Sequence, residues 1–363
     1  MKDRKCINYA YQLDAFRLFA MITIFWNHCR FLKLNEASDQ LFESWFHYGG
    51  IGVEFFVMLS GLLVGIIYIN KPWDKNYTID FYKKKAFRLF PMYWISLLFF
   101  LPEILSAKGL LGWGANGMSF TLLQSITPKT WGLYNSPAWT ISTLWIMYLL
   151  SPFFSKILDK LSGRQQIALI LTITVVAYIL NSRYYYTNQT SIWFFYISPF
   201  YRWVTFLQGM IVGRLAATDL FSYKNVDEKV KSLIEVLVIG LFIGLFLIIH
   251  RKDNAGFYYP FYFVIFLYVF YIGGGHFSKL LSAKWLFNLA KISYAFYLIH
   301  WFVTVNISNY ILSHYLHNYT YGNLMILFFM ELAFTLGLAL LMNKYIENRI
   351  NSYINRHFLN QNK

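Results

Sequence analysis

The chain of 363 residues is 57% hydrophobic and 21% aromatic, and only 13% of its residues are charged. This composition excludes an ordinary soluble domain, in which about a quarter of the residues are charged. The net charge of +15 could indicate a nucleic-acid partner, but the basic residues gather between long apolar segments, as they do in the cytoplasmic loops of membrane proteins. The sequence therefore predicts a polytopic protein in a lipid bilayer and no nucleic-acid partner.

Apolar segments long enough to cross a hydrocarbon layer of about 30 Å recur along the chain. They predict an all-α membrane bundle of about ten transmembrane helices, near 13–31, 48–70, 89–106, 137–157, 165–181, 192–216, 233–250, 257–275, 289–313 and 324–346. With the N-terminus inside, 22 of the 32 Lys and Arg residues fall on the cytoplasmic side, in agreement with the positive-inside rule. Both termini are therefore expected in the cytoplasm.

The first apolar segment is expected to remain as a helix, because it carries Asp14 and Arg17 and no small-residue cleavage pattern follows it. Cys6 and Cys29 would lie on opposite sides of the membrane, so no disulfide is predicted. We expect residues 1–363 to form one membrane domain with no fused soluble domain. The expected location is the inner (cytoplasmic) cell membrane.

Two costly polar residues stand out in this first helix. Arg17 and His28 lie eleven residues apart, about three helical turns, which places them on one face and roughly 16 Å apart along the axis. A central Arg costs about 2.5–3.5 kcal/mol to insert, so a functional role is the default interpretation. With the predicted topology, Arg17 lies in the inner half of the helix and His28 at its outer end.

Glu54 follows one turn into the second predicted helix, level with the outer half of the first. A carboxylate there could orient His28 and hold it in the correct tautomer. The alternative is a Glu that extends to the membrane interface.

A basic cluster lies at the inner face before the third predicted helix, where Lys83, Lys84, Lys85 and Arg88 occupy four of six positions. One interpretation is a topology signal or a contact for anionic lipid headgroups. The other is a docking site for a phosphate-rich donor, because Lys85 and Arg88 lie one turn apart and could bind a pyrophosphate together.

The longest predicted loop, 107–136, lies on the outer side and contains Trp113 and Trp131. A loop of this length is often functional, and it could cover an outward-facing cavity. It could equally be an interfacial segment anchored by the two tryptophans.

Five ordered motifs resemble the acyltransferase-3 family of integral membrane acyltransferases. They are the basic residue, ten-residue gap and histidine within 13–28, the run GVEFFVMLSG at 52–61, KAFRLFP at 85–91, ISYAFYLIHW at 292–301 and IENR at 346–349. One departure is Leu144, which stands where many members carry a glutamate. The resemblance covers the chain from end to end.

The resemblance implies transfer of an acyl group, most often acetyl, from cytoplasmic acyl-CoA (acetyl-CoA) to a hydroxyl of an extracytoplasmic glycan such as O-antigen, capsule or exopolysaccharide. Acetyl-CoA would be a co-substrate, with no permanently bound cofactor. His28 would act as general base or transient acyl carrier, Arg17 would neutralise the thioester oxygen or another part of the donor, and Glu54 would orient His28. Lys83, Lys84, Lys85 and Arg88 would bind the donor phosphates.

Three further residues are candidates for substrate binding, namely Arg202, His300 and Trp139. Arg202 needs a partner such as Glu54 or an acceptor group, and for His300 a structural hydrogen bond is the favoured alternative. His314 and His317 lack a third ligand, so no metal site is predicted.

A polysaccharide or lipid-linked glycan transporter (flippase) is the competing function, since a bundle with polar residues near mid-membrane also describes carriers. A flippase would not require the inner basic cluster, and the chain lacks the broken helix pairs typical of carriers.

Overall fold

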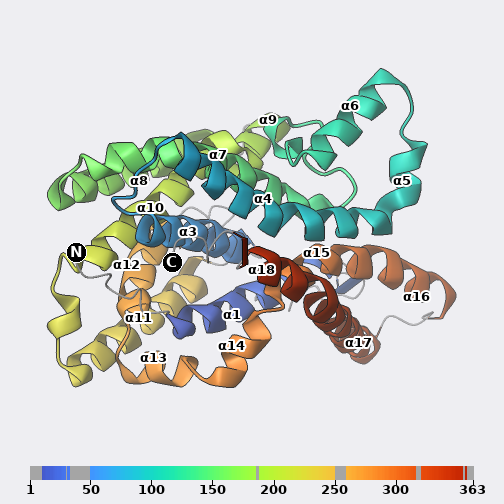
Figure 1. Cartoon of the computed structure of the whole chain (residues 1–363). Helices are drawn as coiled ribbons and strands as arrows, with labels where there is room; N and C mark the ends of the chain where they lie inside the picture. The colour runs from blue at the N-terminus through green and yellow to red at the C-terminus, as the bar shows by residue number, and fades with distance from the viewer. Residues whose placement is uncertain are drawn as a thin grey trace.

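The computed structural model describes residues 10–29, 31–32, 50–184, 188–249, 259–315, 320–354 and 356–357. Within these ranges all regular elements are helical, which confirms the predicted all-α class (Figure 1). The α-helices are α1 (Tyr11–His28), α3 (Gly50–Ile67), α4 (Lys75–Leu97), α5 (Leu101–Ser106), α6 (Gly109–Phe120), α7 (Trp139–Asp159), α8 (Gly163–Tyr184), α9 (Gln189–Ile192), α10 (Pro199–Thr218), α11 (Glu228–Ile249), α12 (Tyr259–Ile272), α13 (His276–Leu281), α14 (Lys284–Ala290), α15 (Ser293–Phe302), α16 (Ser308–His314), α17 (Tyr321–Met342) and α18 (Asn348–Ile354).

Short 3₁₀ and π segments connect several of these helices. The 3₁₀ segments are η2 (Leu98–Phe100), η3 (Gln124–Ile126), η4 (Ser136–Ala138) and η6 (Tyr223–Asn225). The π segments are η5 (Trp193–Ile197), η8 (Val303–Ile307) and η9 (Asn343–Glu347). Because η8 and η9 join α-helices without a break, α15–α16 and α17–α18 each form one long helical stretch.

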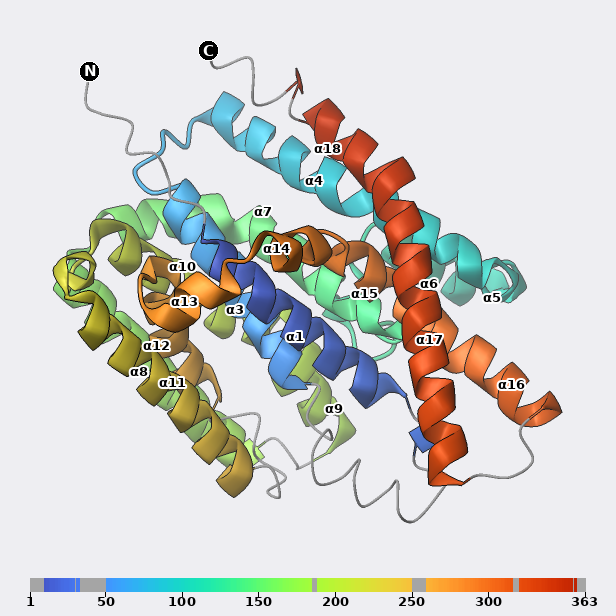
Figure 2. The same cartoon turned by 90° about the horizontal axis from the view of Figure 1, so that it is seen from below.

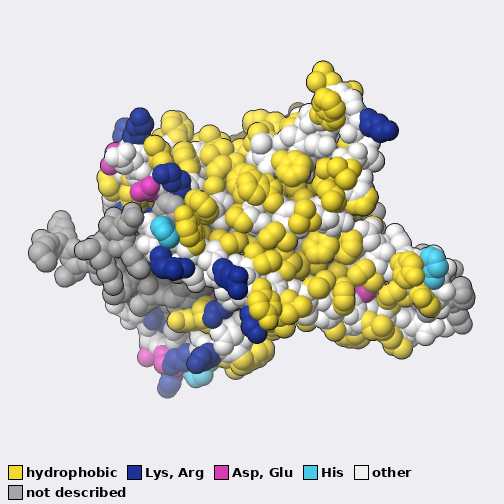
Figure 3. Space-filling model, turned by 45° about the vertical axis from the view of Figure 1, so that its right-hand side comes forward, with side chains coloured by type: hydrophobic (Ala, Val, Ile, Leu, Met, Phe, Trp, Pro, Cys, Tyr) yellow, Lys and Arg dark blue, Asp and Glu magenta, His cyan; other side chains and the backbone are white. Residues whose placement is uncertain are grey.

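Six helical stretches in the described ranges are long and apolar enough to cross a membrane. They are Gly50–Ile67, Lys75–Ser106, Ser136–Asp159, Gly163–Tyr184, Ser293–His314 and Tyr321–Ile354. Figure 3 shows a broad hydrophobic belt across the middle of the molecule, with Lys and Arg side chains gathered mainly toward one end. The protein is therefore a multi-pass membrane protein.

The other four predicted spans coincide with α1, α10, α11 and α12 but are not among these six stretches. Helices α1 and α10 contain polar residues that lower their mean hydropathy, and these side chains face other helices rather than lipid. Gln12 and Asp14 of α1 are buried, as are Arg202 and Gln208 of α10. The count of ten spans and the cytoplasmic placement of both termini remain predictions.

Two predicted boundaries differ from the structure. Helix α4 begins at Lys75 rather than near residue 89, because Asp74 caps it by accepting a hydrogen bond of 2.8 Å from the backbone N–H of Tyr77. The basic cluster is therefore helical. The predicted loop 107–136 contains α6, and Leu110, Leu111 and Trp113 on that helix are exposed. This exposure favours the interfacial interpretation over a cover for a cavity.

Helix α1 occupies the middle of the bundle (Figure 2). It contacts α3, α12, α13, α14 and α15. Its polar face is therefore enclosed by protein along much of its length, which is how Arg17 and His28 are accommodated within a membrane domain.

Helices α3 and α10 pack backbone to backbone through four glycines. A Cβ on Gly61 would overlap the carbonyl oxygen of Phe206, and one on Gly209 would overlap that of Met58. Gly65 and Gly213 make the equivalent approach one turn further along. Such small-residue contacts are a common way to join helices in a bilayer, where there is little hydrophobic force between them.

We expect Gly209→Ala to destabilise the protein by about 1–3 kcal/mol, because the added methyl group has no room beside the α3 backbone. The control is Gly240→Ala in α11, where a Cβ would meet nothing within 4 Å. That change should leave stability equal or raise it, since Ala is the better helix former. Thermal unfolding of the two purified variants in detergent measures the difference, and equal midpoints would contradict the packing argument.

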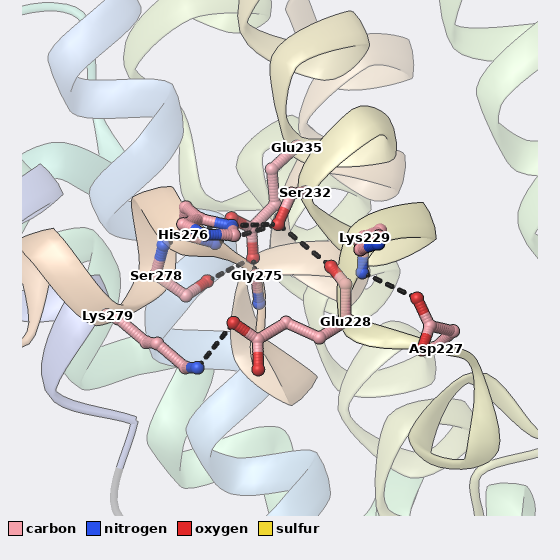
Figure 4. A network of polar contacts seen from close by, with 9 residues as sticks. All are labelled: Asp227, Glu228, Lys229, Ser232, Glu235, Gly275, His276, Ser278 and Lys279. Carbon is pink, nitrogen blue, oxygen red and sulfur yellow. Dashed lines mark hydrogen bonds and ion pairs between the residues drawn. The ribbon is translucent and has the colours of Figure 1, made fainter.

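A polar network attaches α11 to the turn before α13 (Figure 4). Glu235 is fully buried and accepts hydrogen bonds from the backbone N–H of Gly275 (3.0 Å) and Ser278 (3.1 Å). At the exposed edge, Lys279 pairs with Glu228 at 2.5 Å. Because α13 also contacts α1, this network helps to hold the peripheral helices against the central one.

Candidate active site

Arg17 lies in the N-terminal half of α1 and lines a cavity of about 160 Å³. Its guanidinium forms an ion pair of 3.0 Å with Asp14 and donates a hydrogen bond of 3.3 Å to Ser293 Oγ in α15. Asp14 precedes Arg17 by one turn, so the pair forms within one helix. These two contacts fix the position of the Arg17 cation at the cavity wall.

Two of the four predicted donor-binding cations reach the same cavity. Lys85 and Arg88 line it from α4, and Arg17 lines it from α1. The ammonium group of Lys85 lies 4.1 Å from the ring centroid of Tyr148, a cation–π contact. Arg88 is exposed, so the basic side of the cavity lies at the molecular surface. Three cations from two helices thus surround one largely apolar space.

The remaining two basic residues lie elsewhere on α4. Lys84 lines a separate polar cavity of about 170 Å³ together with Asp74 and Asp80. Lys83 is exposed and lines neither cavity. Helical geometry explains the division, since consecutive residues point in directions about 100° apart.

His28, at the last position of α1, lies against His300 of α15. Nδ1 of His28 and Nε2 of His300 are 2.8 Å apart, within hydrogen-bond distance. The two ring planes differ by only 20°, and the ring centroids are 5.0 Å apart. This separation is close to the N···N distance plus the radii of the two rings, as expected when the rings point at each other. The rings therefore meet edge to edge in nearly one plane, which is the geometry of a direct hydrogen bond.

Tyr297 lies between the cavity and the histidine pair. Its side chain lines the cavity, its ring centroid is 5.4 Å from that of His300, and its hydroxyl donates a hydrogen bond of 2.6 Å to the Pro137 carbonyl. Ser293, Tyr297 and His300 are spaced four and three residues apart and share one helix face. Tyr297 was not among the site residues expected from the sequence, although this spacing could have indicated it.

From the sequence we expected Glu54 to contact His28. In the structure its carboxylate instead contacts two residues of α10. Its carboxylate pairs with Arg202 and accepts a hydrogen bond of 3.1 Å from Thr205. All three side chains are buried. Arg202 needed a partner within the bundle, and the structure supplies Glu54.

Trp139 belongs to this buried cluster as well. The Arg202 guanidinium lies 5.9 Å from the Trp139 ring and 4.7 Å from the Tyr196 ring. Trp139 and Arg202 do not line the basic cavity. These two predicted substrate-binding residues therefore cluster with Glu54 and contact one another rather than the cavity.

Leu144, which stands in place of the glutamate of the resembling motif, lines the cavity from α7. Because Leu144 is apolar, α7 contributes no carboxylate to the cavity that Arg17, Lys85 and Arg88 line. Among the described residues no group of three His, Cys, Asp or Glu side chains could hold a metal ion. His317 lies outside the described residues.

The chain is similar to proteins of a known family. The family described as "Acyltransferase domain" (acyltransferase-3) matches residues 10–356. The O-acetyltransferase OatA of Staphylococcus aureus strains NCTC 8325 / PS 47, COL and MRSA252 is 22% identical over 371 residues, which cover 93% of this chain and 56% of the relative. The chain thus spans about half the length of these curated relatives. No solved structure matches it.

The family match covers nearly the whole chain, including the Arg17 cavity and the His28–His300 pair, and it favours the enzyme over the transporter that the helix count alone would allow. The chain therefore belongs to the acyltransferase-3 family of membrane acyltransferases.

Proposed function

We propose that this protein transfers an acetyl group from acetyl-CoA, bound from the cytoplasmic side, to a hydroxyl of a glycan outside the cytoplasmic membrane. The observation that carries the proposal is the arrangement of groups beside α1. Arg17, Lys85 and Arg88 line a cavity that Tyr297 also lines, and Tyr297 lies next to His300, the hydrogen-bond partner of His28. The name of the relatives, O-acetyltransferase, supports the choice of acetyl and of a hydroxyl acceptor.

The donor would bind by its phosphates. Lys85 and Arg88 lie one turn apart on α4 and can contact adjacent phosphate oxygens. The pantetheine arm would extend past Arg17, and the apolar lining formed by Leu59, Ile141 and Leu144 suits that arm and excludes water around the thioester.

The chemical step would take place at His28. The acceptor oxygen bonds to the acyl carbon, the thioester C–S bond breaks, and the sulfur leaves as a thiolate. As general base, His28 takes the hydroxyl proton; as acyl carrier, it first receives the acyl group and then gives it to the acceptor. In both cases one ring nitrogen must be unprotonated.

Charge removal in the cavity tests donor binding. We expect Lys85→Met and Arg88→Met each to weaken acetyl-CoA binding about tenfold or more, because a hydrogen bond to a charged group contributes about 1.5–3 kcal/mol. Lys75→Met is the matched control, since Lys75 begins the same helix but is exposed and lines neither cavity. Isothermal titration calorimetry in lipid nanodiscs gives the dissociation constants. Unchanged affinity in both cavity variants would leave lipid contact as the role of these cations.

The acceptor is tested in cells. Mass spectrometry of surface glycans from cells with and without this protein should show O-acetyl groups that depend on it. Identical glycans in the two cultures would contradict the proposed function.

A further inference from the structure

The contacts of His300 determine which of its nitrogens carries a proton. Nδ1 of His300 lies 2.6 Å from the backbone carbonyl oxygen of Tyr297. A carbonyl oxygen can only accept, so Nδ1 is the protonated nitrogen. The His300 side chain is 1% exposed and packs near the rings of Phe25 and Phe296. Such surroundings favour the uncharged ring, in which Nε2 then holds a lone pair.

This lone pair determines the tautomer of His28. Nε2 of His300 faces Nδ1 of His28 at 2.8 Å, and a hydrogen bond needs exactly one proton between the two nitrogens. Since His300 supplies the lone pair, Nδ1 of neutral His28 carries the proton. Its Nε2 is then the unprotonated nitrogen, as a base or an acyl acceptor requires.

We propose that His300 is a positioning residue that sets the tautomer of His28. The chain of contacts runs from the Tyr297 carbonyl to His300 and on to His28, and it assigns Nε2 of His28 as the reacting nitrogen. This inference rests on the proposed function of His28. In Ser-His-Asp enzymes a carboxylate holds the imidazole in the correct tautomer; here a second histidine, fixed by a backbone carbonyl, has that role.

The arrangement also accounts for Glu54. The carboxylate expected to orient His28 is engaged by Arg202 and Thr205, and the orienting contact comes from a neutral group instead. A neutral partner avoids an additional charge beside His28 in the bundle, where charges are costly.

The tautomers can be observed directly by nitrogen NMR. The full chain, labelled with ¹⁵N-histidine and held in lipid nanodiscs, gives distinct shifts for protonated and unprotonated ring nitrogens. We expect His28 and His300 both to be neutral and protonated at Nδ1, with signals assigned by their loss in His28→Ala and His300→Phe. A proton on Nε2 of His28, or a charged His300, would overturn the proposal. This measurement needs no variant to be active.

Kinetics provide a second readout. His300→Phe keeps an aromatic ring but removes the lone pair, and we expect kcat to fall about 10²-fold, at the lower end of the range for acid–base catalysis, with KM for acetyl-CoA within about twofold. His300→Gln retains an oxygen acceptor that can reach the Nδ1–H of His28, and it should recover at least a tenth of the wild-type kcat. A structural role alone would not separate kcat from KM in this way.

The two proposals fail separately. If His28→Ala remains fully active, the proposed function of His28 is wrong, whatever the tautomer. If His28→Ala is inactive while folded His300→Phe matches the wild type, or if the Phe and Gln variants lose equal activity, only the positioning role of His300 is wrong.

Discussion

His28→Ala should lower acetyl transfer by about 10²–10⁴-fold while the protein remains folded and inserted. The reason is that the proposed chemistry needs one basic nitrogen at this position, and proton transfer by a positioned side chain contributes about that factor. The side chain is only partly buried at the end of α1, so its removal should disturb the packing less than removal of a fully buried side chain. The measurement is acetyl transfer from labelled acetyl-CoA to a glycan acceptor, with size-exclusion chromatography to confirm folding.

A matched control is His314→Ala in α16, which makes the same change at an exposed histidine outside the site. It should retain wild-type activity. Wild-type activity in His28→Ala would remove His28 from the mechanism. Incubation with labelled acetyl-CoA in the absence of acceptor, followed by peptide mass spectrometry, separates the two roles of His28, since only an acyl carrier would retain the label.

Arg202→Met should destabilise the protein by about 3–5 kcal/mol. This change leaves the Glu54 carboxylate buried without its cation, and an uncompensated buried charge accounts for most of such a loss. Thermal unfolding in detergent, compared with the wild type, measures the effect. A variant as stable as the wild type would show that the pair contributes nothing to the fold.

The double variant Glu54→Leu with Arg202→Met separates structure from substrate binding. Apolar residues of similar volume often replace a buried ion pair with little loss of stability, so the double variant should be more stable than Arg202→Met alone. If it also regains activity, the pair is structural. If it is stable but inactive, Arg202 or Glu54 has a role in the reaction beyond packing.

Helix positions were predictable from the sequence because long apolar runs indicate helices in a membrane protein. The same periodicity placed Arg17 and His28 on one face, and the structure confirms that both face protein neighbours. It also paired Lys85 with Arg88, and these two cations line the cavity.

The partners of the site residues were not predictable in the same way. Glu54 and Arg202 are 148 residues apart, and His28 and His300 are 272 residues apart. A helix that is apolar on every side gives no sign of which neighbour it meets. The sequence therefore assigned Glu54 to His28, which lies at a similar predicted depth in the membrane. The choice among Lys83, Lys84 and Lys85 likewise depended on how α4 is rotated against α7 and α15.

The contact between α3 and α10 has a consequence for biogenesis. Glu54 and the glycines of α3 find their partners only after α10 has been made, 148 residues later. At ordinary rates of synthesis this takes roughly 7–30 s. During that interval α3 must lie beside the insertion machinery or a chaperone, or it must lie in lipid with Glu54 protonated. Truncation of the nascent chain before residue 199 should therefore leave α3 accessible to degradation.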